Sequence, residues 1–310
     1  MLFHSLLLFL AAVIWGTAFV AQSVGAEYIG GFTLTGLRFL IGSFVLVPVI
    51  LISSGIRSRS ENAEKERSDQ TSAGRITLLR GGLVCGLVLC TASNLQQLGI
   101  PHTTVGKAGF ITACYIILVP IFGLFLKKTC SPLVWLAVML AVIGLYLLCI
   151  KESFRLEQGD TLVLISSVFY ALHILTIDHY APLTDPIKLS CLQFFVTGIV
   201  SCIPALIFEH PDWNAVCAAR LPILYTGVLS SGAAYTLQII GQNGMNPTVA
   251  SLIMSLESSI SVISGWLFLG QEMSERELLG CLFMFAAIVI AQLPAPRMRK
   301  LKKRRSGTNS

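Results

Sequence analysis

Residues Gly99–Leu126 read GIPHTTVGKAGFITACYIILVPIFGLFL, and this stretch decides the fold. After the turn at Gly99 and Pro101 the sequence is mostly apolar, and about 20 such residues cross a bilayer core of about 30 Å at about 1.5 Å per residue. A membrane-spanning helix is therefore predicted. Lys107 lies about one turn inside it. Because a charge in mid-membrane costs roughly 2.5–3.5 kcal/mol, this side chain is expected to face protein or water.

The same stretch has a counterpart in the second half of the chain, where Thr104–Lys107 aligns with Thr248–Ser251. One helical face of the first copy carries Lys107, Ile111, Cys114 and Tyr115, and the matching face of the second carries Ser251, Ser255, Ser258 and Ser259. Lipid-facing stripes are instead rich in Leu, Ile, Val and Phe. We interpret this small or polar face as the wall of a shared cavity. Close helix packing is the alternative, because small residues favour it as well.

The composition is that of an integral membrane protein. Of 310 residues, 54% are hydrophobic and only 12% are charged, and the mean hydropathy is +0.76. Average soluble domains contain about 25% charged residues. The net charge of +6 does not indicate nucleic-acid binding, because the basic residues concentrate in segments that flank helices. The nine cysteines lack metal-ligand spacing, so neither a zinc site nor a disulfide framework is expected, and no cofactor is predicted.

Ten spans are predicted from the apolar runs, which gives an all-α membrane fold. They lie near residues 5–24, 32–53, 76–98, 103–126, 132–150, 159–179, 187–208, 219–241, 246–269 and 274–293. Residues 53–75 form a polar, highly charged segment that predicts a solvated loop.

The distribution of lysine and arginine predicts the orientation. With both termini on one side, the links and tail on that side carry about fifteen basic residues, and the opposite side carries about four. Cytoplasmic loops carry such an excess, so both termini are predicted to be cytoplasmic. The basic tail, residues 297–310, is expected to lie against anionic lipid headgroups.

Internal similarity extends beyond the opening stretch. Trp15 aligns with Tyr170, Thr35–Phe39 with Ser190–Phe194, and Leu95-Gln96 with Leu237-Gln238. Each half holds five predicted spans, residues 1–152 and 153–296. Because five is odd, the second copy enters the membrane from the opposite face. Two inverted five-helix repeats with a substrate site between them are typical of secondary transporters.

Several short motifs carry a family resemblance over nearly the whole chain. They are Trp15-Gly16-Thr17, Arg38-Phe39-Leu40, Thr104–Phe110, Ser255-Leu256-Glu257 and Gly265–Glu272. With these motifs the chain resembles the EamA family of the drug/metabolite transporter superfamily. The resemblance implies ten helices in two inverted units, a place in the bacterial inner membrane, and transport of small metabolites, often outward. The chain departs from the family pattern at Ser258, where proline is usual, and at Gln271, which precedes the usual glutamate.

Three ionisable residues within spans are candidates for function, namely Arg38, Lys107 and Glu257. Structural ion pairs that join helices are the alternative for all three. Glu257 lies in mid-span, on a face turned away from the serine row. A protonatable carboxylate there suggests that transport is coupled to protons.

Aromatic and amide side chains complete the predicted cavity. The candidates already named are the three charged residues, Tyr115 on the face of the first copy, and Ser255 and Ser258 on the matching face of the second copy. The further candidates are Trp15, Asn94, Gln97, Tyr170, His173, Tyr235 and Gln238. Rings can contact the apolar part of an amphipathic solute while amides orient its polar part. Hydrogen bonds between helices are the alternative, and we prefer that alternative for Gln96.

These features predict a secondary transporter that moves a small metabolite or amino-acid-like solute by alternating access, with export as the expected direction. The chain has no phosphate-binding loop and none of the usual hydrolase motifs, so neither ATP hydrolysis nor an enzyme is expected. A channel-like facilitator or a non-transporting sensor or scaffold is the alternative. The expected partners are the lipid bilayer and a small solute, anionic or zwitterionic, and the chain is expected to act as a monomer or homodimer.

Overall fold

The computed structural model describes residues 2–57, 72–128, 131–149, 158–270 and 274–293. Over these ranges all regular structure is helical, with no strand. The elements are α1 (Leu2–Ala26), α2 (Gly31–Arg57), α4 (Ser72–Gly99), η1 (Ile100–His102), α5 (Val105–Thr112), α6 (Tyr115–Phe125), α7 (Pro132–Cys149), α8 (Gln158–Tyr180), η2 (Ala181–Leu183), α9 (Pro186–Pro204), η3 (Ala205–Glu209), α10 (Trp213–Ala218), α11 (Arg220–Leu224), η4 (Tyr225–Tyr235), α12 (Thr236–Gln242), α13 (Pro247–Met254), α14 (Leu256–Leu269) and α15 (Glu275–Gln292).

Within the described ranges, eight helical segments are long and apolar enough to cross a membrane. The apolar parts of α7 and α15, Pro132–Leu147 and Leu278–Ala291, are shorter than such a segment. The fold is therefore an all-helical bundle with eight clear candidate spans and two shorter apolar helices. Helix α2 continues to Arg57 and α4 begins at Ser72, so both helices extend into the segment predicted as a loop, residues 53–75. Residues 58–71 and the tail 297–310 lie outside the described ranges.

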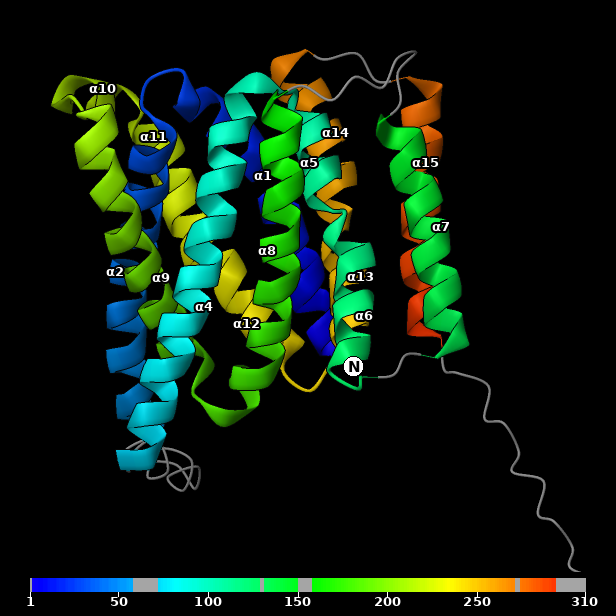
Figure 1. The fold of residues 1–310 in the computed structure, drawn as a ribbon, viewed down its shortest axis with the longest axis horizontal. Coiled ribbons are helices and arrows are strands. Elements are labelled where there is room, and N and C mark those ends of the chain that lie inside the picture. The colour runs from blue at the N-terminus through cyan, green and yellow to red at the C-terminus, as the bar shows by residue number, and fades with distance from the viewer. Residues whose placement is uncertain (1, 58–71, 129–130, 150–157, 271–273, 294–310) are drawn as a thin grey trace, which may run out of the picture.

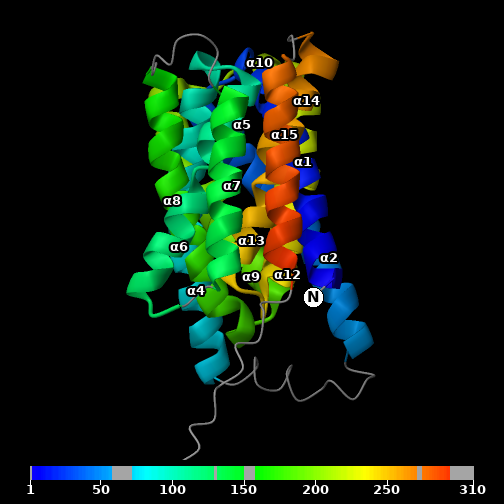
Figure 2. The same ribbon diagram turned by 90° about the vertical axis from the view of Figure 1, so that its right-hand side faces the viewer.

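The helices run along one common direction and alternate up and down (Figure 1). Helix α1 rises from the end marked N, whereas α8, the first helix of the second half, descends toward that end. Helices α7 and α15 lie side by side at one edge of the bundle, as Figure 2 shows from that side. Corresponding helices of the two halves thus run in opposite directions.

The contacts between helices repeat across the two halves. Helix α1 packs along η4 and α12, and its counterpart α8 packs along α4 in the same way. Helices α2 and α9, which hold corresponding places in the two halves, pack against each other, as do α7 and α15. This exchange of equivalent contacts is what a two-fold relation between the halves produces.

Two spans are broken at corresponding places. Helix α5 ends at Thr112 and α6 begins at Tyr115, while α13 ends at Met254 and α14 begins at Leu256. The first pieces, α5 and α13, each have eight residues, and a side chain caps each start: Thr104 accepts from the Lys107 N–H and Asn246 from the Thr248 N–H. They start from opposite ends of the bundle, so α5 packs on α14 and α6 on α13 (Figures 1 and 2).

A third span is irregular in another way. Residues Tyr225–Tyr235 form a π-helix, with wider turns than the α-helix that continues from Thr236. A π-helical segment of this length is rare, and short ones often occur at functional sites. The wider turns change which side chains share a face, and this decides which residues of η4 point inward.

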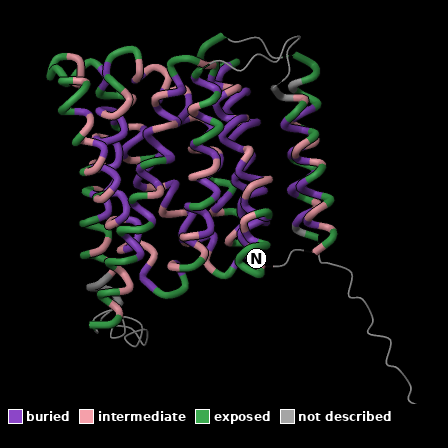
Figure 3. Tube along the Cα trace, in the orientation of Figure 1, coloured by how far each residue is buried: buried purple, intermediate pink, exposed green. Residues whose placement is uncertain are grey.

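The interior of the bundle is unusually polar. Figure 3 shows buried residues along the inner helix faces and exposed residues at the ends and outer faces. Large apolar side chains such as Phe44, Leu51 and Phe285 are exposed, as expected where lipid replaces water. Arg38, Gln97 and Glu257 are instead buried. Polar side chains are therefore buried inside the bundle and apolar side chains face outward, which keeps the polar groups away from the hydrocarbon of the membrane.

Close helix contacts depend on glycine, and Gly86 provides a test. A Cβ atom added there would lie 2.7 Å from Val196 Cβ and 2.9 Å from the Gln193 carbonyl oxygen of α9. We expect Gly86→Ala to destabilise the detergent-solubilised protein by about 1–3 kcal/mol, because either α4 or α9 must move. Gly123→Ala is the control, since its nearest neighbour is 3.8 Å away. Equal unfolding temperatures for the two variants would contradict the close contact.

Candidate functional site

A cavity lies where the two broken spans meet the other central helices. It contains about 460 Å³ of space not filled by atoms, part of which is open to the surroundings. Its lining consists of Trp15, Phe19, Gln22, Arg38, Gln96, Thr112, Tyr115, Tyr170, His173, Ile174, Ser230, Tyr235, Gln238, Met254 and Glu257. Both chain breaks contribute to it, Thr112 and Tyr115 from one and Met254 and Glu257 from the other. Both halves of the chain therefore build one cavity.

The breaks explain why the cavity is here. In a membrane every backbone N–H and C=O group needs a partner, so irregular backbone is tolerated only within protein or beside a polar cavity. Gly16 on α1 adds a second constraint, because a Cβ atom there would lie 2.5 Å from Ile260 Cβ on α14. The close approach of α1 to α14 brings Trp15 and Glu257 to the same cavity.

Tyr235 is the centre of an aromatic cluster in the cavity wall. Its ring centroid lies 4.7 Å from that of Trp15, 5.7 Å from Phe39, 5.9 Å from Phe194 and 6.0 Å from His173. The Trp15 Nε1–H donates to the Ser230 carbonyl oxygen at 3.2 Å, which fixes the indole. Aromatic pairs at such separations contribute about 0.5–1.5 kcal/mol each beyond burial. The cluster gives the cavity a rigid apolar wall.

Arg38 is a cation buried in this wall. Its side chain is 2% exposed, Nη1 donates to the Gln22 Oε1 atom at 3.1 Å, and Cζ lies 4.8 Å from the centre of the Phe39 ring. Among the described residues, neither Nε nor Nη2 of Arg38 has a hydrogen-bond partner. The guanidinium is thus held in place while two of its nitrogens keep unused hydrogen-bonding capacity.

Glu257 is the acidic residue of the same lining. It is 4% exposed, and its Oε1 atom finds no hydrogen-bond partner within the described ranges. The Tyr115 hydroxyl and the Gln238 Oε1 atom, also in the lining, are unpartnered in that part of the chain too. The cavity therefore offers unpaired acceptors as well as the unpaired donors of Arg38.

Amide groups connect the helices around the cavity. Gln96 Nε2 donates to Thr112 Oγ1 at 2.9 Å, and the Tyr170 hydroxyl donates to Gln96 Oε1 at 3.1 Å. A His173 ring nitrogen lies 3.1 Å from Gln193 Oε1. Gln96 thus joins α4 to the first broken span and to α8, at the edge of the cavity.

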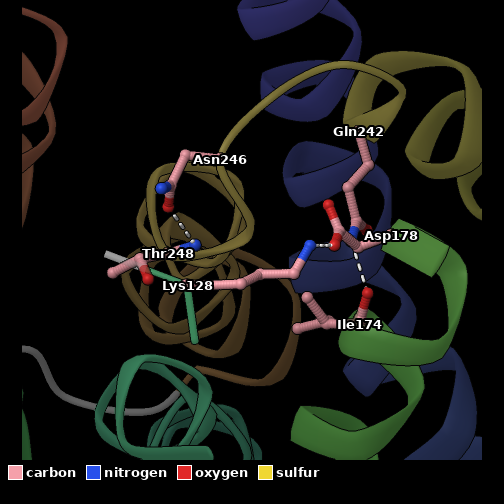
Figure 4. Close-up of polar contacts among 6 residues, drawn as sticks. All are labelled: Lys128, Ile174, Asp178, Gln242, Asn246 and Thr248. Atoms are coloured by element: carbon pink, nitrogen blue, oxygen red, sulfur yellow. Dashed lines mark hydrogen bonds and ion pairs between the residues drawn. The ribbon is translucent and has the colours of Figure 1, made fainter. Parts of the chain in front are cut away.

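In the described part of the chain, two ion pairs join the first broken span and the turn after it to α8, one near each end. The Lys107 Nζ atom lies 2.5 Å from Asp160 Oδ2, and Asp160, which is fully buried, also accepts from Thr103 Oγ1 at 2.8 Å. At the other end Lys128 pairs with Asp178 (Figure 4). In the same region Gln242 donates to the Ile174 carbonyl oxygen at 2.5 Å. These charges neutralise one another away from the cavity.

The architecture and this cavity agree with the comparisons to known proteins. The model of the EamA-like transporter family matches residues 2–150 and again residues 157–292. The chain belongs to the EamA-like transporter family. It is therefore a multi-pass membrane transporter, and the family resemblance of its motifs is confirmed.

Relatives of this EamA-like transporter cover almost the whole chain. An uncharacterized transporter of Archaeoglobus fulgidus is 25% identical over 298 residues, which are 94% of this chain and 86% of the relative. The uncharacterized transporter YwfM of Bacillus subtilis is 23% identical over 96% of each chain. A protein of known crystal structure has a TM-score of 0.72 and 17% identity, covering 94% of this chain and 98% of its own. That likeness concerns the fold.

Most residues predicted for the site lie in the cavity lining of this EamA-like chain. They are Trp15, Arg38, Tyr115, Tyr170, His173, Tyr235, Gln238 and Glu257. Sequence reasoning assigned Gln96 to helix packing, yet it also lines the cavity. Its position beside Asn94 and Gln97 in α4 gave no signal that it, rather than they, faces inward.

The other predicted residues lie outside the lining and have structural partners. They are Asn94, Gln97, Lys107, Ser255 and Ser258. Asn94 donates to Ser201 Oγ on α9 at 2.7 Å, and Gln97 donates to the Gln22 carbonyl oxygen on α1 at 3.3 Å. Both amides thus connect helices.

Three serines of the row, Ser251, Ser255 and Ser258, donate to backbone carbonyl groups one turn back, whereas the Ser259 hydroxyl has no partner among the described residues. Ser255 donates to the Leu252 carbonyl oxygen at 2.8 Å, and Ser258 donates to that of Ser255 at 2.7 Å. Nearby, Gly109 of α5 meets the Ser261 side chain of α14. The small side chains therefore allow α5 and α14 to approach closely, which was the alternative interpretation of the row.

The Lys107–Asp160 pair can be tested by a double-mutant cycle. Lys107→Met leaves the buried Asp160 carboxylate without its cation, and we expect a loss of roughly 1–3 kcal/mol in unfolding free energy, moderated because Lys107 is 23% exposed. Adding Asp160→Asn should restore part of this loss. Lys188→Met at the start of α9 is the control. Additive effects of the two substitutions would exclude a stabilising pair.

Proposed function

We propose that this protein is a secondary transporter that moves a small metabolite or amino-acid-like solute by alternating access. The observation that carries the proposal is the cavity at the two helix breaks, where buried Arg38 and Glu257 keep unpaired polar atoms. Buried charges are costly unless they are compensated, so a protein retains them where a ligand compensates them. A solute with an anionic group for Arg38 and donors for Glu257 and Gln238 fits this arrangement.

We further infer ten crossings in two oppositely directed units, residues 1–152 and 153–296, with the cavity between them. The antiparallel course of corresponding helices and the exchanged contacts support this reading. In this scheme one unit rocks against the other around a fixed solute site. Because one chain supplies both units, a monomer suffices, and a homodimer would place two such sites side by side.

We place the protein in the bacterial inner membrane with both termini in the cytoplasm and infer export of the solute. The excess of basic residues in the links and tail on that side supports the orientation. A fluorescent protein fused to the C-terminus matures only in the cytoplasm, so a dark fusion would reverse the assignment.

A metabolite profile tests transport and its direction. Cells that overproduce the chain should accumulate a small solute outside at the expense of the inside pool. Tyr235→Ala removes the centre of the aromatic wall, so we expect the excess outside to fall by about tenfold or more. Tyr28→Ala, at the exposed end of α1, is the control and should transport like the unchanged chain. Identical profiles with and without the protein would refute transport.

We propose that Glu257 couples transport to protons. The solute identified by that profile would be followed in vesicles with and without a pH gradient. Glu257→Gln keeps the shape of the side chain but cannot exchange a proton, so it should remove the effect of the gradient. Glu27→Gln, in the exposed turn that follows α1, should leave that effect unchanged. A gradient dependence that survives Glu257→Gln would exclude this role.

A further inference from the structure

The guanidinium of Arg38 has a distinctive pattern of used and unused nitrogens. Nη1 is bonded to Gln22, and Nε and Nη2 lack a partner throughout the described chain. These two nitrogens lie along one edge of the planar group, so their N–H bonds point the same way. This edge is the fork that binds the two oxygens of a carboxylate in parallel.

The guanidinium is held rigidly in the cavity wall. The Gln22 bond fixes the opposite side of the guanidinium, and the Phe39 ring lies 4.8 Å from its central carbon atom. Both Arg38 and Gln22 are buried, and both line the cavity. A preformed fork loses little conformational entropy when a ligand binds.

The charges of the lining select the kind of anion. Arg38 is the single arginine or lysine among the lining residues, and Glu257 is their single carboxylate. A phosphate monoester would bring about two negative charges near one cation and one acid in a medium of low polarity. A monocarboxylate brings one charge, which Arg38 matches. The aromatic cluster around Tyr235 suits an apolar body on the same molecule.

We propose that Nε and Nη2 of Arg38 form the binding site, called the seat below, for the carboxylate group of a transported monocarboxylate. Gln22 is the residue that positions this edge of the guanidinium. This assignment rests on the proposed function, because it takes the cavity as the place where the transported solute binds. It adds the chemical class of that solute and the atoms that recognise it.

Matched acids and amides test the seat in the unchanged protein. Thermal unfolding of the purified full-length chain in detergent would be followed with benzoate against benzamide, L-leucine against L-leucinamide, and inorganic phosphate. At least one acid should raise the unfolding temperature in a saturable way, and its amide should not. Protection by neither acid, equal protection by an acid and its amide, or stronger protection by phosphate would each overturn the assignment.

Variants then locate the effect at Arg38. Arg38→Lys keeps the charge but loses the fork, so the dissociation constant of the protecting acid should rise by about tenfold or more. Arg80→Lys makes the same change at an exposed position of α4 and should bind like the unchanged protein. Undiminished acid binding by Arg38→Lys would refute the seat.

Gln22→Glu is a variant that is expected to fold, because the new carboxylate can pair with the Arg38 guanidinium in place of the Gln22 amide oxygen. It should unfold at or above the original temperature while losing protection by the acid. A merely structural Gln22 would leave the dissociation constant of the acid unchanged, which would refute its positioning role.

The outcomes separate this proposal from the proposed function. If the metabolite profile changes but no carboxylate binds, the proposal of transport stands and the carboxylate site at Arg38 is refuted. If a carboxylate binds in a way that depends on Arg38 but the metabolite profile does not change, the carboxylate site stands and the proposal of transport is refuted.

Discussion

The structure depends on the high cost of leaving polar groups unpaired in hydrocarbon. A continuous helix satisfies its own backbone, whereas the N–H and C=O groups at a break need other partners. Tighter turns supply some of them here, such as the bond from the Cys114 N–H to the Ile111 carbonyl oxygen at 3.2 Å and that from the Ser258 N–H to the Ser255 carbonyl oxygen at 3.1 Å. The breaks between Thr112 and Tyr115 and at Ser255 therefore lie inside the bundle, where other helices surround them. Because both breaks border the same cavity, irregular backbone and polar side chains coincide there.

The charged side chains divide into two kinds under the same constraint. Lys107 with Asp160 and Lys128 with Asp178 neutralise each other near the ends of the spans and tie the first broken span to α8. Arg38 and Glu257 are more deeply placed and keep unpaired atoms, although a buried charge without a counter-ion is the costlier arrangement. Paired charges thus hold the scaffold, and the unpaired ones remain for a solute.

Small residues have a supporting part that complements the charges. Gly16 and Gly86 let helices approach until side chains meet backbone, and Ser251, Ser255 and Ser258 donate to carbonyl groups one turn back. Without a hydrophobic driving force between helices in lipid, such close contact supplies much of the association. The tight α1–α14 and α5–α14 contacts hold the two breaks in register around the cavity.

The sequence by itself determined the membrane class, the family and most of the cavity, because apolar runs and motifs are local properties of the chain. Hydropathy alone located the eight helical segments that are long enough to span a membrane in the described structure, and the rings of Trp15, Tyr170 and Tyr235 had few other reasons to lie within them. Tertiary structure decided which polar groups turn inward. A helical face predicted across Cys114 assumes unbroken turns, and the break at that point changes the phase.

The π-helical turns of η4 had the same effect, since they bring both Ser230 and Tyr235, which are five residues apart, into the lining. Helix α4 is regular, and there the contacts with neighbouring helices determine which amide faces the cavity. Asn94 bonds to α9 and Gln97 bonds to α1, so that Gln96 is the one that lines the cavity. Periodicity gives the relative directions of side chains along one helix. Only the packed bundle determines which of those directions leads to lipid, to a neighbour or to the solute.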